Sequence, residues 1–328
     1  MTIALRRTRA LGAALLGIAL LSAGSHAAAQ KYPEKTVRIV TPFGPGGGTD
    51  VFARILAQRL TEQYSQQFIV ENRPGAGSTL GTESVAKAPP DGYTFLMTSA
   101  SFSFNPGLYP KLRYDSIRDF APVTQVVRVP HVIVVLPSFP AASLQEFVKI
   151  ARARPGEVLY ASSGAGSAMH LAGALFGIVT QTRLTHVPYK SGGATVTAVL
   201  GGEATTAFNT LETVIAQIRA KRVRALAVST RERAAAIPDV PTAMEAGVKG
   251  YEAIGWFGLF APGGTPPAIV QQMSNDVAKI MATPAMRERA LQEGATPIGS
   301  TPAEFTKFVH GEIAKWTKII HDAGIRLE

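Results

Sequence analysis

Two glycine-rich loops are the segments of this chain best suited to hold a ligand. The first is residues 41–50, TPFGPGGGTD, and the second is residues 161–170, ASSGAGSAMH. Each loop follows a strand-like run and precedes a helical pattern, so it presents backbone N–H groups at a helix N-terminus. Such groups bind anions when no side chain is in the way. The pattern therefore predicts two anion-binding loops.

The first loop has two competing interpretations. One is a dinucleotide site, because Glu71 ends the next expected strand about twenty residues further on. Against it, the third glycine of G-x-G-x-x-G would be Thr49 or Val51, and no Gly-Lys-Ser/Thr follows for a phosphate loop. The other is a plain turn in which Asp50 caps the helix, as Ser167 can in the second loop without any ligand. We favour the anion site over both.

Patterns typical of enzymes and metal sites are absent from the sequence. It has no cysteine, no G-x-S-x-G elbow and no H-E-x-x-H pair. The histidines beyond the N-terminal segment show no ligand spacing; they are His131, His170, His186, His310 and His321. We therefore expect no enzymatic activity, no cofactor and no metal.

The basic charge of the chain is dispersed. Lys and Arg number 33 against 23 Asp and Glu, a formal net charge of +10. Acids and bases are interspersed, and the longest basic run is residues 220–224, AKRVR. Nucleic-acid binding calls for clustered charge with aromatic residues on basic helices, which this chain lacks. We expect a basic surface and no nucleic-acid partner.

Residues 1–29 have the features of a signal peptide. Arg6, Arg7 and Arg9 precede an apolar run, residues 10–24, which leads into an A-x-A site. The apolar run is shorter than the ~20 residues that span a bilayer. We expect cleavage near Ala29 and a periplasmic mature protein.

Strand-like and helical patterns alternate from residue 36 onward. A first unit has strands at 37–40, 68–70 and 94–97 and helices at 50–64 and 78–87. Two apolar runs, 123–129 and 132–136, are broken by Pro130 and lead to a second alternating unit that ends near residue 228. The run at 254–260 leads back, and helices at 267–281, 284–293 and 302–321 close the chain.

This order predicts an α/β fold of two lobes, each a mainly parallel sheet flanked by helices. Lobe 1 comprises residues 30–128 and 254–328, and lobe 2 comprises residues 129–253. The chain crosses between them near 128–131 and 250–255. Ligands of such sheets bind at the carboxyl ends of the strands, which here face an interlobe cleft.

At these loops the chain resembles the Bug-type solute receptors of tripartite tricarboxylate transporters, over essentially the whole mature sequence. The shared stretches include residues 42–50, 71–77 (ENRPGAG), 88–94 (APPDGYT), 105–109 (NPGLY), 119–123 (DFAPV), 186–190 (HVPYK), 224–228 (RALAV) and 255–262 (GWFGLFAP). The resemblance implies a type II periplasmic-binding (Venus-flytrap) fold that closes on a small carboxylated ligand.

The resemblance also implies which residues line the site, largely through backbone amides and water. They are Phe43, Gly46, Gly47, Thr49 and Asp50 in the first loop, Gly164, Gly166, Ser167 and His170 in the second, and Ser99 and Ser101 after a strand. The chain departs from the family at three positions that usually carry Asp, namely Ala198, Thr205 and Asn209. Of these we expect Asn209, at a strand end, to contact the ligand. Phe102 and Phe104 either make the pocket apolar or pack in the core.

An amino-acid ligand would need a carboxylate for its ammonium group in a closed cleft. The loss of Asp at position 209 therefore predicts a ligand without an amino group, an aliphatic or aromatic mono- or dicarboxylate. We expect a periplasmic receptor that delivers this small organic acid to membrane permease subunits. The alternatives are a ligand-responsive partner of a membrane receptor kinase and, less favoured, a cofactor enzyme that uses the first loop.

Overall fold

The computed structural model describes residues 32–322 and 324–327, so the expected signal peptide, residues 1–29, lies outside the described residues. Residues Lys35–Glu328 belong to one body, and this body holds every helix and strand described for the chain. Within the described ranges, no helix combines the length and the apolar character needed to span a bilayer.

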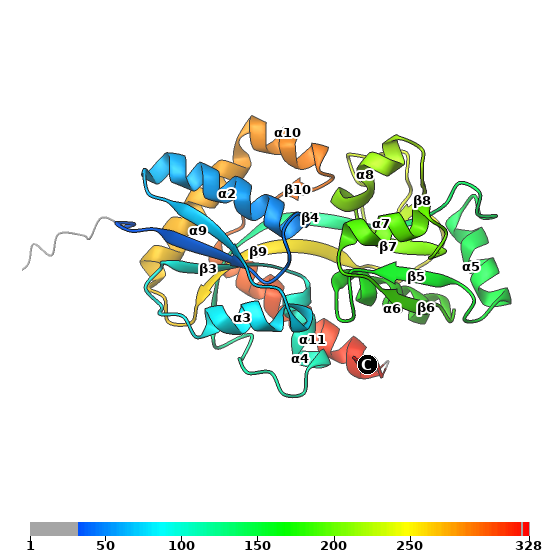
Figure 1. Cartoon of the computed structure of the whole chain (residues 1–328), viewed down its shortest axis with the longest axis horizontal. Coiled ribbons are helices and arrows are strands. Elements are labelled where there is room, and N and C mark those ends of the chain that lie inside the picture. Colours follow the sequence, from blue (N-terminus) through cyan, green and yellow to red (C-terminus); the bar gives the residue numbers. More distant parts are fainter. Residues whose placement is uncertain (1–31, 323, 328) are drawn as a thin grey trace, which may run out of the picture. The chain divides into compact units, whose positions relative to one another are not determined.

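The first strands form a parallel group. β1 (Val37–Thr41) lies between β2 (Phe68–Asn72) and β3 (Thr94–Ser99) and pairs with both in parallel. The apolar residues of β1 and β3 are buried, whereas Ile69 of β2 is exposed. The helices α2 (Gly48–Tyr64) and α3 (Thr79–Ala86) cover these strands and occupy the predicted positions (Figure 1). The carboxyl end of β1 therefore delivers the first glycine loop to the start of α2.

Two long strands join the two ends of the sheet. β4 (Phe120–Val135) pairs antiparallel with β9 (Ile254–Pro262) as far as Pro130, and from His131 onward with β7 (Thr206–Thr210) and β8 (Arg224–Val228). The expected break at Pro130 is wrong, since β4 is continuous. The strand tolerates Pro130 because proline has no N–H to leave unpaired. The next amide, that of His131, donates to Ser229 Oγ at 3.0 Å.

The second unit follows the predicted alternation. Its helices are α5 (Leu144–Ala153), α6 (Ala168–Thr180), α7 (Gly192–Leu200) and α8 (Leu211–Arg219), and its remaining strands are β5 (Leu159–Ser162) and β6 (Thr185–Pro188). β5 pairs in parallel with β6 and β7. The strand order is β2-β1-β3-β9-β4-β7-β5-β6, with parallel pairs toward both ends and antiparallel pairs in the middle.

The closing segment packs back on the first unit. It comprises α9 (Pro267–Ala282), α10 (Pro284–Gln292), β10 (Thr296–Pro297) and α11 (Pro302–Asp322). Three elements were not predicted: β10, the short 3-10 helix η1 (Ala76–Ser78) and α4 (Ser101–Leu108), which packs on α11. Phe102 stacks on Phe260 at 4.5 Å and Phe104 meets Trp316 at 4.6 Å, both fully buried. Of the two roles considered for these phenylalanines, core packing is confirmed.

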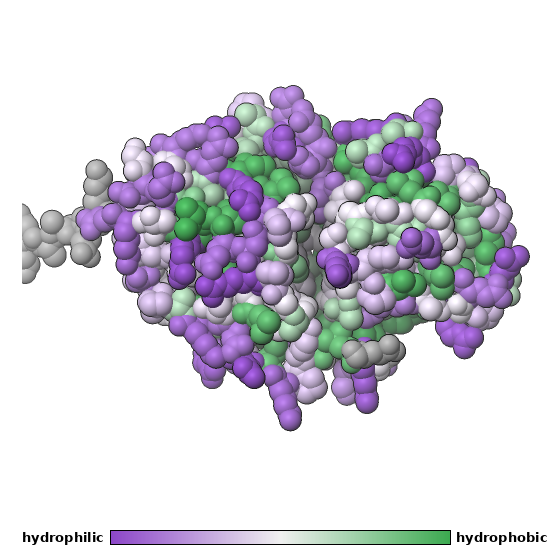
Figure 2. All heavy atoms as spheres, in the orientation of Figure 1, coloured by the Kyte–Doolittle hydropathy of each residue, from purple (hydrophilic) through white to green (hydrophobic). Residues whose placement is uncertain are grey.

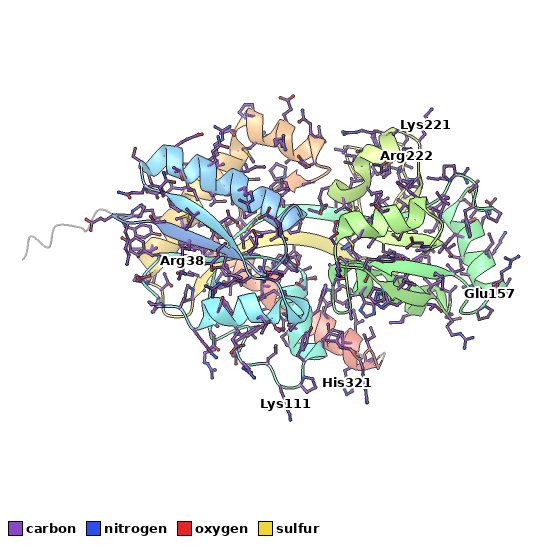
Figure 3. All side chains as sticks on the ribbon, in the orientation of Figure 1. Arg38, Lys111, Glu157, Lys221, Arg222 and His321 are labelled. Carbon is purple, nitrogen blue, oxygen red and sulfur yellow. The ribbon has the colours of Figure 1, made fainter. Side chains whose placement is uncertain are left out.

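Charged and polar residues cover most of the face shown in Figure 2. Arg38 on β1, Lys111 in the turn after α4 and Lys221 in the turn after α8 lie well apart (Figure 3). The dispersal expected from the sequence is therefore present in the fold.

Candidate ligand-binding site

The first glycine loop is tied together by one carboxylate and one amide side chain. Asp50 Oδ2 accepts from the Gly46 amide at 3.0 Å and from Arg54 Nε at 2.9 Å. Asn72 Nδ2 donates to Asp50 Oδ1 at 2.9 Å and to the Phe43 carbonyl at 3.0 Å. These bonds fix the loop from both sides. The sequence reasoning did not include Asn72, which lies in the shared stretch 71–77.

Asp50 and the Gly46 amide are thus used inside the loop. Burial opposes ionisation of Asp50, but the hydrogen bonds from Arg54, Gly46 and Asn72 outweigh it and lower the pKa of this carboxyl. Gly46 itself has φ +82° and is exposed, Gly47 is the N-cap of α2, and Thr49 is buried. The backbone amides still available to a ligand in this loop are those of the residues that follow Gly46.

Replacing Asp50 with alanine should lower the free energy of unfolding by about 1–3 kcal/mol, because the Gly46 amide, Arg54 and Asn72 lose the acceptor that ties the loop together. The native pKa of Asp50 lies below its ordinary value. The ionised carboxylate of Asp50 therefore stabilises the fold at neutral pH, and this stabilisation is lost as the pH falls through the lowered pKa. Urea denaturation should show that Asp50→Ala loses less free energy of unfolding at pH 3 than at pH 7. Glu62→Ala, an exposed acid on the same helix, is the control; an equal loss in both variants would contradict the role of Asp50.

The second glycine loop is held by a serine and two imidazoles. Ser162 Oγ lies 3.1 Å from the Gly164 amide and 2.6 Å from His186 Nε2. His170 Nδ1 accepts from the Gly166 amide at 3.1 Å. Both glycines have positive φ, +120° and +77°, which favours glycine there. This loop uses two of its predicted amides internally, those of Gly164 and Gly166.

The two imidazoles stack with their ring centroids 4.0 Å apart. Burial lowers the pKa of His170 to about 4, with a further contribution from His186, and burial lowers the pKa of His186 to about 4. Both rings are therefore neutral at neutral pH, which lets His170 accept from Gly166. Ser167 Oγ caps α6 by accepting from the His170 amide at 3.2 Å. His186 was not predicted as a site residue, although it begins the shared stretch 186–190.

Ser99, the last residue of β3, and Ser101, the first residue of α4, lie together. Their Oγ atoms are 3.1 Å apart, and Ser101 Oγ is 3.3 Å from Ser78 Oγ. Asn105 Nδ2 donates to Ser78 Oγ at 3.3 Å. Ser78, at the end of η1 with φ +83°, is the member of this hydroxyl cluster that the sequence reasoning missed.

Asn209 is completely buried on β7. Its Oδ1 accepts from Thr195 Oγ1 of α7 at 2.8 Å, while its Nδ2 is buried without a hydrogen-bond partner. A buried amide donor left unpaired is costly. Asn209 is therefore the predicted site residue that most clearly needs an acceptor.

Helix N-termini from both units converge around these groups. A Cβ placed on Gly48 of α2 would lie 2.6 Å from Glu212 Oε1 of α8, and one on Gly192 of α7 would lie 2.7 Å from Thr213 Cγ2. A Cβ on Gly77, beside the hydroxyl cluster, would lie 3.7 Å from the Ala165 carbonyl in the second loop. The starts of α2, α4, α6, α7 and α8 thus lie around one region, which favours an anion.

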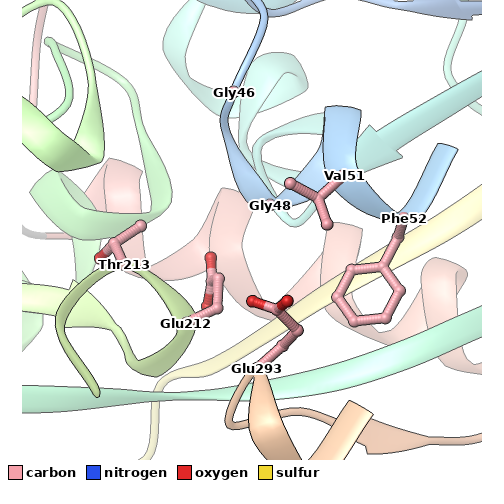
Figure 4. Close-up of a pocket in the computed structure, with 7 residues that line it drawn as sticks. All are labelled: Gly46, Gly48, Val51, Phe52, Glu212, Thr213 and Glu293. Atoms are coloured by element: carbon pink, nitrogen blue, oxygen red, sulfur yellow. The ribbon is translucent and has the colours of Figure 1, made fainter. Parts of the chain in front are cut away.

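A pocket of about 100 Å³ opens at the first loop (Figure 4). It is lined by Gly46, Gly48, Val51, Phe52, Glu212, Thr213 and Glu293. Burial raises the pKa of Glu212 to about 7 against hydrogen bonds from the Thr210 side chain and from its own backbone, and the negative charge of Glu293 adds to the rise. The acid-poor cleft expected from positions 198, 205 and 209 did not include these two glutamates. Glu212 lies three residues after Asn209, but the sequence pattern predicted only that it belongs to a helix.

Comparisons with known proteins agree with this geometry. A family model described as "Tripartite tricarboxylate transporter family receptor" matches residues 52–325. Protein BugT of Bordetella pertussis (strain Tohama I) is 36% identical over 319 residues, covering 96% of this chain and 98% of BugT.

Two solved structures of Rhodopseudomonas palustris proteins are similar to this chain. Rpa4515, solved with adipate, is 36% identical with a TM-score of 0.85 and covers 90% of this chain and 100% of its own. MatC, with bound malate, is 31% identical with a TM-score of 0.81 and covers 88% and 100%. They confirm the α/β periplasmic-binding fold and the resemblance seen in the sequence. The chain belongs to the tripartite tricarboxylate transporter family of receptors, the Bug-type solute receptors, which bind a solute rather than transform it.

Proposed function

We propose that this receptor works in the periplasm, where it captures a small dicarboxylate without an amino group and delivers it to membrane permease subunits. The observation that carries the proposal is the buried Nδ2 of Asn209, an unpaired donor among converging helix N-termini. A carboxylate oxygen supplies the acceptor that this amide lacks. Adipate in Rpa4515 and malate in MatC support a dicarboxylate.

The predicted site residues divide into two groups in this proposal. Those expected to face the ligand are Gly47, Thr49, Ser99, Ser101, Ser167 and Asn209. Those expected to shape the loops are Phe43, Gly46, Asp50, Gly164, Gly166 and His170, because their polar groups bond within the loops. Backbone amides held rigidly bind an anion without reorganising, which favours affinity.

A thermal-shift screen tests the function. It should include adipate, malate, succinate, an aromatic dicarboxylate, aspartate, glutamate and neutral sugars. A ligand at 100 times its dissociation constant adds about 2.7 kcal/mol of stability, a clear shift. The proposal expects dicarboxylates to shift the melting temperature most. Shifts with sugars alone would contradict the carboxylate site, and stronger shifts with the amino acids would contradict the predicted ligand class.

We also propose that the lobes, 30–128 with 254–328 and 129–253, close by bending where β4 changes partner. Three segments meet there: His131 Nδ1 lies 3.1 Å from the Ala253 carbonyl, to which Ser229 Oγ donates at 2.5 Å. Loop amides from both lobes reach one ligand only when the cleft is shut. X-ray scattering should show a smaller radius of gyration with adipate than without it. An unchanged radius under saturating ligand would contradict the hinge.

A further inference from the structure

Glu212 occupies an unusual place for a carboxylate. It stands in the first turn of α8, beside Gly48 at the start of α2. Its Oε2 atom is buried and has no hydrogen-bond partner. Glu293, at the end of α10, lines the same pocket from the other side (Figure 4). A charged carboxylate with an unpaired buried oxygen and a second acid nearby is strongly disfavoured.

Among the described residues, no cation is found that offsets the charge of Glu212. Arg289 is 2.7 Å from Glu293, and Arg54 is 2.9 Å from Asp50, so each is engaged elsewhere. Neither α7 nor β7 carries a titratable side chain. The elements around Glu212 carry these titratable groups: Arg287, Glu288 and Arg289 on α10 with Glu293 at its end, Asp50, Arg54, Arg59, Glu62 and Tyr64 on α2, and Arg128 and His131 on β4. Of these, His131 is buried with its pKa lowered to about 4 by desolvation, so it is neutral.

We propose that Glu212 enters the ligand-bound site as a neutral carboxylic acid, so that the receptor takes up one proton from solvent with each dicarboxylate. The proposal rests on the proposed function. The acid O–H of Glu212 supplies a donor that an ionised carboxylate lacks, and it removes a negative charge facing an anionic ligand. Glu212 then cannot pair with an ammonium group, which keeps the preference for ligands without one.

The direction of the pH effect follows from opening and closing. In an open cleft Glu212 is solvated and has an ordinary pKa of 4.5, whereas the contacts described here raise the pKa to about 7. Closure therefore takes up a proton at pH values between these two pKa values, and the affinity for the dicarboxylate falls as the pH rises. The dissociation constant should increase about tenfold from pH 6 to pH 8, a range in which ordinary carboxyls stay ionised.

Calorimetry with adipate measures both the affinity and the proton. At pH 6, titrations in buffers of different ionisation enthalpy should report close to one proton taken up by the wild type. Glu212→Gln, a neutral isostere, should take up none and should change affinity less than twofold from pH 6 to pH 8. Glu293→Gln should keep the proton uptake but shift it to lower pH. Glu288→Gln, an exposed acid on the same helix as Arg289, should behave as the wild type.

Several outcomes would overturn the proposal. A wild-type affinity independent of pH, or a pH dependence retained in Glu212→Gln, excludes a proton on Glu212. A loss of aspartate or glutamate binding in Glu212→Gln would show an ionised Glu212 that pairs with an ammonium group. If no acid binds any variant, the proposed function fails. Carbon-13 NMR of the ligand-free protein tests the proton separately: uptake on closure expects an ordinary Glu212 pKa near 4.5 in the open cleft, and a pKa already raised without ligand contradicts proton uptake with the ligand.

Discussion

Gly46→Leu is expected to weaken dicarboxylate binding by at least about a hundredfold while leaving the protein folded. Gly46 has φ +82°, and a Cβ there meets no other atom within 4 Å. Leucine would therefore fit without a clash, but it would occupy the pocket that Gly46 lines. It would also strain the turn whose amide bonds to Asp50, at a cost of about 1–2 kcal/mol.

Gly202→Leu is the matched control, because it separates strain from the site. Gly202 has φ +77° and also meets nothing within 4 Å, but it lies just after α7, away from the glycine loops. Both variants should lose similar stability in thermal melts. Calorimetry with the acid that gives the largest thermal shift should show that only Gly46→Leu loses affinity. Equal affinities in the two variants would move the ligand away from the first loop.

Asn209→Asp should weaken a dicarboxylate by about a hundredfold or more. The substitution keeps an oxygen for the Thr195 hydroxyl, which lies 2.8 Å away. It replaces the unpaired Nδ2 by a second oxygen, so a completely buried position turns from a donor into a negative charge. Like charges in a poorly hydrated site repel strongly.

Succinate and aspartate distinguish charge from shape. Asn209→Asp should lose succinate and shift the preference toward aspartate, whose ammonium group can pair with the new carboxylate. Thr195→Val, which removes only the hydroxyl that orients Asn209, should weaken succinate by about tenfold without changing that preference. Unchanged succinate binding in Asn209→Asp would place Asn209 outside the site.

The regular elements were predictable because their periodicity is local. α2, α5 and α11 appear where apolar spacing and caps indicate helices. α4 was missed because its sequence, SFSFNPGL, alternates polar and aromatic residues and contains Pro106. Its two aromatic rings are buried by α11 and β9, contacts that no local pattern reveals.

The site was predictable in its loops and less so in its electrostatics. Asp50 was named, but its use by Gly46 and Asn72 depends on how β2 lies beside β1. Glu212 and Glu293 come from different parts of the chain and meet only through tertiary packing. The shared stretches of sequence mark which loops matter, whereas the protonation of a buried acid depends on its neighbours in space.

The strand β4 has a consequence for how the molecule unfolds. Its residues pair with β9 in one half and with β7 and β8 in the other, within one continuous backbone. Loss of this strand removes a hydrogen-bonded neighbour from both halves at once, so neither half can melt and leave the other intact. Cooperativity of this kind makes the described part of the chain from residue 35 onward a single unfolding unit. A ligand held at the cleft then protects residues at both far ends of the sheet as strongly as those it touches.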